Sequence, residues 1–197
     1  MDMIKISPKK ITGQWVEGYA LDFHTVSSKP SHYEYGHLQF DTKRTEIGEY
    51  LHRLKYKKDK SVIEDIVRTA ADFVRSKSWP VDLVVSVPPS SNRSFQPVVV
   101  LAEQLAKVLN IEYCGNCVEK IKGTPQLKNV FDDNERKKLL SGAFQVDRLK
   151  IEGKSVLLFD DLYDSGATIN EVFSELQKSG KAERVHTLTI TMTRVHK

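Results

Sequence analysis

The sequence is poor in the features that mark specialised structural classes. It has 2 cysteines in 197 residues, which excludes a disulfide-rich scaffold. No stretch approaches the roughly 18 consecutive apolar residues of a membrane-spanning helix. Residues 1–10 lack the apolar core of a signal peptide. These absences predict a cytoplasmic protein without a membrane partner.

Charge of neither sign dominates the sequence. The formal net charge is +4, with 40% hydrophobic and 28% charged residues, an ordinary balance for a globular protein. Such a charge favours anionic ligands weakly and allows only non-specific nucleic-acid binding. The length suits one domain with a small N-terminal addition.

The most informative stretch is residues 156–168. Residues 156–159 are apolar and predict a short buried strand. Two adjacent carboxylates, Asp160 and Asp161, follow where that strand is expected to end. A loop of small and hydroxylated residues comes next. Apolar residues then recur at helical spacing, at Ile169, Val172, Phe173 and Leu176.

This order of elements predicts a site for a sugar phosphate. A loop that enters a helix offers unpaired backbone N–H groups and the positive end of the helix dipole to an anion. Ser165 and Thr168 add hydroxyl donors, and Gly166 allows close backbone approach. Asp160 and Asp161 could accept hydrogen bonds from vicinal hydroxyls or hold a hydrated magnesium ion.

The stretch resembles the phosphoribosyl pyrophosphate (PRPP) motif of type I phosphoribosyltransferases. It has the apolar strand, two acids, three variable residues and Ser-Gly-x-Thr. The resemblance implies an α/β fold with a mainly parallel sheet flanked by helices. Residues 1–50 would form an N-terminal hood or subdomain, and residues 51–197 the phosphoribosyltransferase-like domain. It also implies magnesium-dependent transfer of 5-phosphoribosyl between pyrophosphate and a nitrogenous base, with a homodimer possible.

The same resemblance assigns roles to residues of the motif. Asp160 and Asp161 would bind the ribose hydroxyls and, through water, magnesium. Asp164 would also act as general base, as an aspartate does in purine-salvage members, although many relatives have Thr there. The residues of the 5′-phosphate cradle would be Asp164, Ser165, Gly166, Ala167 and Thr168.

A second strand-loop-helix precedes the motif. Residues 81–87 predict a buried strand stopped by Pro88-Pro89, and a helix is expected from Pro97. The intervening loop resembles the pyrophosphate loop of the ComF-like branch, without the Gly-Gly of many other members. The residues expected to bind pyrophosphate are Ser90, Ser91, Asn92 and Arg93. Arg93 is the best candidate, because a guanidinium can bind two oxygens at once.

Residues 120–144 are charged and poor in apolar periodicity, with a short helix expected at 132–140. In type I enzymes the loop at this place folds over the active site and excludes water. The lid lysines would be Lys120, Lys122 and Lys128, which would gain a partner only when a diphosphate binds. The alternative is a solvated connector.

Elements before the first loop are expected from local patterns. Residues 19–23 alternate as a strand with one buried face, and residues 27–37 predict a loop. A helix starts at Thr45 and ends in the basic cluster 55–60, which faces either a phosphate-rich ligand or solvent. Ser61 is the expected cap of the next helix.

Two further segments complete the expected sheet. Residues 111–121 predict a strand that contains Cys114 and Cys117. The pair is interpreted as incidental, and a disulfide within a regular strand is not expected. Residues 184–193 predict a last strand.

Two functions remain open from the sequence. The first is the enzyme described above. The second is a non-catalytic PRPP- or nucleotide-binding regulator, or a ComF-like accessory protein in DNA metabolism. ComF-like proteins often carry a four-cysteine zinc module, which this sequence lacks. A binding motif alone cannot separate these functions, since a fold and its ligand site do not imply catalysis.

Overall fold

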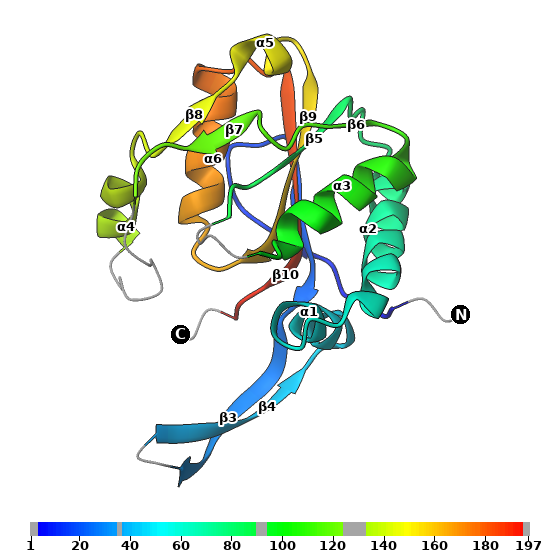
Figure 1. Cartoon of the computed structure of the whole chain (residues 1–197), viewed down its shortest axis with the longest axis vertical. Helices are drawn as coiled ribbons and strands as arrows, with labels where there is room; N and C mark the ends of the chain where they lie inside the picture. Colours follow the sequence, from blue (N-terminus) through cyan, green and yellow to red (C-terminus); the bar gives the residue numbers. More distant parts are fainter. Residues whose placement is uncertain (1–3, 35–36, 90–93, 124–132, 195–197) are drawn as a thin grey trace.

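A six-stranded sheet forms the centre of the computed structural model, which describes residues 4–34, 37–89, 94–123 and 133–194 (Figure 1). All neighbouring strands are parallel except the first pair. The strand order is β1 (Lys9–Lys10), β2 (Gly18–Phe23), β10 (Arg184–Met192), β9 (Ser155–Tyr163), β5 (Leu83–Ser86) and β6 (Glu112–Tyr113). The α/β class and the mainly parallel sheet expected from the sequence are thereby confirmed.

Helices cover both faces of the sheet (Figure 1). One face packs against α1 (Glu46–Tyr56), α2 (Ile63–Lys77) and α3 (Pro97–Leu109). The other packs against α6 (Ala167–Lys178) and the small antiparallel pair of β7 (Val118–Lys120) and β8 (Phe144–Val146). The remaining helical elements are η1 (Lys60–Val62), α4 (Asp133–Leu140) and α5 (Arg148–Ile151).

Strand β9 shows how the sheet divides two apolar cores. Leu157 and Phe159 are buried in the core beneath α1–α3, whereas Val156 and Leu158 are buried in the core beneath α6. Successive side chains of a strand point to opposite faces. Both faces are covered, so the strand is an uninterrupted apolar run. For the same reason β2 has two buried faces, not the single one expected.

Local sequence signals set most helix starts. The Thr45 hydroxyl accepts from the Gly48 N–H at 3.1 Å, which confirms the expected cap of α1. Pro97 occupies the first turn of α3, as predicted. Ser61 does not cap the next helix. Asp59 caps η1 instead, because its carboxylate accepts from the Ser61 N–H and hydroxyl at 3.0 and 2.6 Å.

The prediction of a loop at residues 27–37 was wrong. The chain forms a long antiparallel ribbon of β3 (Thr25–Glu34) and β4 (His37–Arg44), which projects from the body beside α1 (Figure 1). Most side chains of the ribbon are exposed, so it lacks the apolar alternation of a half-buried strand. Backbone pairing, not core burial, defines it.

The interpretation of Cys114 and Cys117 was also wrong, since they form a disulfide with Cα atoms 5.5 Å apart. Residues 111–121 are not one strand. They form β6 in the central sheet and β7 in the small one. Gly115 and Asn116 lie in the turn between the cysteines, which brings two residues within bridging distance that a regular strand would separate.

The N-terminal residues contribute to the main sheet through β1 and β2, and α1 runs across residue 50. The division of the chain at that residue stays a prediction. Within the described part of the chain, no helix combines the length and apolar character needed to cross a membrane.

Candidate functional site

The sheet has a topological switch point between β5 and β9. From β5 the chain passes through α3 to β6 on one side, and from β9 through α6 to β10 on the other. The two connections therefore diverge and leave a crevice beyond the carboxyl ends of these strands. In open α/β sheets this crevice is where ligands bind.

The acidic pair lies where β9 loses one neighbour. Pairing of β9 with β5 ends at Phe159, whose carbonyl accepts from the Val87 N–H at 2.9 Å. Pairing with β10 continues to Tyr163. The sequence predicted that the strand ends at the acids. The strand instead continues through them to Tyr163. Beyond Phe159 the edge of β9 that faces β5 is no longer paired with that strand, and Asp160 and Asp161 line the cavity there.

A cavity of about 270 Å³ occupies this crevice. It combines residues from both strand-loop-helix units with the end of α1. Its lining residues are Lys55, Tyr56, Val87, Pro88, Pro89, Gln96, Pro97, Val98, Asp160, Asp161, Leu162 and Thr168. The acidic pair and the first turn of α6 therefore open onto one space.

Asp160 is held in an environment that disfavours its charge. Burial, together with the negative charge of Asp161, raises the pKa of the Asp160 carboxyl well above its usual range, while Lys55 opposes the shift. Asp160 Oδ1 accepts from the Asp161 N–H at 2.8 Å. These surroundings favour the neutral form of the Asp160 carboxyl over its anion.

Asp161 is paired with Lys55 of α1. The Lys55 Nζ lies 3.0 Å from each of the two Asp161 carboxylate oxygens. Asp161 follows Leu157 and Phe159 at intervals of two residues, so it points to the face covered by α1. The basic cluster 55–60 thus places one lysine in the cavity. The sequence left open whether this cluster met ligand or solvent.

The loop after the acids turns sharply into α6 at Gly166. Gly166 adopts φ +78°, and a Cβ there would strike the Tyr163 ring. This allows the chain to turn into α6, whose helical residues begin at Ala167. The Ala167 N–H makes a long 3.4 Å contact with Ser165 Oγ. Thr168 lines the cavity from the first helical turn.

Asp164 and His24 are positioned by residues that the sequence did not single out. The Thr193 hydroxyl donates to Asp164 Oδ1 at 2.9 Å. His24 follows β2, and its Nδ1 lies 3.3 Å from Thr191 Oγ1. Burial lowers the pKa of His24 to about 4, and the charges of Arg44 and Lys55 contribute. These neighbours come from distant sequence, so no local motif signals them.

The predicted pyrophosphate contacts Ser90, Ser91, Asn92 and Arg93 lie outside the described residues, as does Lys128. The flanking Pro88, Pro89 and Gln96 line the cavity.

Lys120 and Lys122 belong to β7 and the residues that follow it. Lys122 Nζ already donates to the Ser141 carbonyl at 3.2 Å, which corrects the expectation that it has no partner before ligand binds. The short helix expected at 132–140 is confirmed as α4, and the lid stays a prediction.

Asp160 and Asp161 suit only one mode of magnesium binding. Asp160 and Asp161 supply the oxygen ligands that magnesium prefers. No cluster of three or more His, Cys, Asp or Glu side chains suited to a metal occurs in the described ranges. The acids therefore fit a hydrated ion held mainly by a ligand's own phosphates, not a protein cage.

The arrangement of sheet and helices is the fold of type I phosphoribosyltransferases. A family model described as the phosphoribosyl transferase domain matches residues 52–195. The chain belongs to this family. A comparison with curated protein sequences gives no match.

Several solved structures share the fold. Adenine phosphoribosyltransferase from Saccharomyces cerevisiae has a TM-score of 0.50 and 14% identity, covering 84% of this chain and 82% of that one. Another adenine phosphoribosyltransferase structure gives 0.50 and 14%, covering 86% and 85%. Glutamine PRPP amidotransferase from B. subtilis gives 0.50 and 17%, covering 77% of this chain but only 34% of that one. At these identities the likeness concerns the fold alone.

Proposed function

We propose that the protein transfers a 5-phosphoribosyl group between pyrophosphate and a nitrogenous base, with PRPP and magnesium. The observation that carries the proposal is the shared cavity of about 270 Å³, which joins the acidic pair to the start of α6 at the switch point. Membership of the phosphoribosyltransferase domain family supports the same chemistry.

Each part of the cavity has a role in this proposal. The carboxylates of Asp160 and Asp161 accept hydrogen bonds from the ribose diol or from magnesium-bound water. The backbone from Asp164 to Thr168 receives the 5′-phosphate at the positive end of α6. Asp160 and Asp161 would hold magnesium through water, and the ion would supply positive charge to the diphosphate leaving group. Asp164, oriented by Thr193, accepts a proton from the incoming base.

The test is release of pyrophosphate from PRPP and magnesium in the presence of each of a panel of purine and pyrimidine bases. Turnover with one base, lost in D164N and in the double variant D160N/D161N, is expected. Saturable PRPP binding without turnover by any base would favour a PRPP-binding regulator. The ComF-like relationship is a separate proposal. It rests on the resemblance of the loop between Pro89 and Pro97 to that branch of the family.

A further inference from the structure

Lys55 occupies the position beside Asp161 that a cation would take. Its Nζ lies 3.0 Å from both carboxylate oxygens, so the ammonium bridges the group symmetrically. The two side chains are 18% and 14% exposed. Lys55 and Asp161 both line the candidate ligand cavity. The lysine therefore lies inside the site and not on its outer wall.

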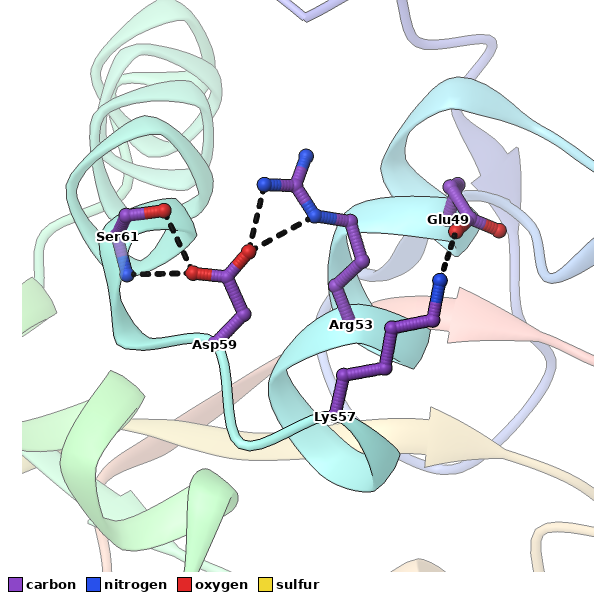
Figure 2. A network of polar contacts seen from close by, with 5 residues as sticks. All are labelled: Glu49, Arg53, Lys57, Asp59 and Ser61. Atoms are coloured by element: carbon purple, nitrogen blue, oxygen red, sulfur yellow. Dashed lines mark hydrogen bonds and ion pairs between the residues drawn. The ribbon is translucent and has the colours of Figure 1, made fainter.

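A purely structural role explains this ion pair poorly. Removing two charges from water carries a desolvation cost that their attraction often fails to recover, and apolar side chains can join two elements as well. Another lysine at the same end of α1 behaves as a surface residue. Lys57 Nζ lies 3.8 Å from Glu49, with side chains 62% and 41% exposed. Figure 2 shows Lys57 reaching back along α1 to Glu49, while Arg53 and Ser61 converge on Asp59.

Charge decides what the pair does to a metal ion. A divalent cation that approaches Asp161 meets the fixed charge of Lys55 within a few ångströms, where repulsion between like charges is strong in a partly buried site. A phosphate group that arrives with the metal changes this balance, because its oxygens offer the ammonium an alternative partner.

We propose that Lys55 is a built-in counter-cation that keeps free divalent metal off Asp161, so that metal enters only together with a phosphorylated ligand. The proposal rests on the proposed function, in which the acidic pair receives the diol or the hydrated metal. Lys55 is then a positioning residue that couples metal binding to ligand binding.

The test measures binding of Mn²⁺ alone, without PRPP, by electron paramagnetic resonance. The variant K55M removes the charge in the cavity, and K57M removes one at the exposed end of the same helix. We expect K55M to bind Mn²⁺ at least about tenfold more tightly than the parent, from the loss of a like charge nearby. K57M and the charge-conserving K55R should match the parent. The double variant K55M/D161N should lose the gain.

Equal Mn²⁺ affinity of K55M and the parent would overturn the proposal, as would an equal gain in K57M. K55Q repeats the measurement with a polar neutral side chain, so a packing defect in one variant does not decide the result. Binding of PRPP–magnesium to the parent is measured separately. Failure of that binding refutes the proposed function, whereas the Mn²⁺ titrations decide the role of Lys55 on their own.

Discussion

The hydroxyl of Thr193 donates a hydrogen bond to Asp164 Oδ1 at 2.9 Å. Thr193 follows the last central strand, and Asp164 lies in the loop before α6. The carbonyl of Tyr163 also accepts from the Thr193 N–H at 2.9 Å. The end of β10 therefore fixes the orientation of the carboxylate proposed as general base.

T193V should reduce turnover by about tenfold while PRPP affinity is kept, because Asp164 loses its orienting donor. D164N should reduce turnover by about 100-fold or more, in the range of general-base catalysis. Steady-state kinetics and calorimetric PRPP titration check both variants. T42V provides a matched control, since it removes a hydroxyl hydrogen-bonded to Ser28 on the exposed ribbon. If T193V and T42V show the same kinetics, Thr193 does not position Asp164.

The acidic pair should dominate magnesium-dependent binding of PRPP. D160N/D161N removes acceptors for the diol and for metal-bound water, and should cost about 3 kcal/mol or more, the value of one to two charge-assisted hydrogen bonds. Calorimetry with and without magnesium measures the loss. D41N/D72N removes the same number of carboxylates outside the cavity and should bind like the parent. Equal affinities for the two double variants would rule out the acidic pair as the ribose and metal site.

Gly166 should be required for phosphate binding. An alanine at φ +78° costs about 1–2 kcal/mol in backbone conformation, and its Cβ would also meet the Tyr163 ring. G166A should therefore destabilise the protein and weaken binding of ribose 5-phosphate.

The matched control for Gly166 is Gly153, which has φ +73° and nothing within 4 Å of a built Cβ. G153A has a similar backbone cost away from the cavity and should bind ribose 5-phosphate normally. Urea unfolding and calorimetry separate stability from binding. Normal binding by G166A would show that this loop is not the phosphate cradle.

The pH dependence of stability should reveal the buried Asp160 carboxyl. Its folded pKa lies above the usual value of about 3.9, so between these two values the native state binds more protons than the unfolded state. This group's contribution is fully present below about pH 3.9 and is lost as pH rises through the folded pKa. An asparagine does not titrate, so D160N should gain stability relative to the parent as pH rises, by at most about 1.4 kcal/mol per pH unit.

Urea unfolding at several pH values from 4 to 9 measures this difference. His24 and the other titrating groups are present in both the parent and D160N, so their contributions to the pH dependence largely cancel in the difference. A difference that stays constant with pH would mean that Asp160 titrates normally in the folded protein.

Local patterns in the sequence identified the elements that carry the proposed chemistry. The apolar run 156–159, the acids and the small-residue loop form one continuous stretch, so strand, acceptors and helix start follow from neighbouring residues. The starts of α1 and α3 also follow from local chemistry, through Thr45 and Pro97.

Features that depend on distant residues or on backbone pairing were missed. The Lys55–Asp161 pair joins residues 106 positions apart, and depends on which face of β9 lies beneath α1. The β3–β4 ribbon has exposed polar faces, so its sequence lacks the apolar alternation that marks a strand. For Cys114 and Cys117, the intervening Gly-Asn is a turn signal that the strand interpretation overlooked.

The most direct test of the central claim is a crystal structure of the protein with PRPP and magnesium. The account predicts the ribose hydroxyls within hydrogen-bond distance of Asp160 or Asp161, with the 5′-phosphate on the backbone N–H groups of residues 165–168. PRPP bound elsewhere, for example in the groove between α2 and α3 lined by Arg68, Arg75 and Gln104, would contradict it.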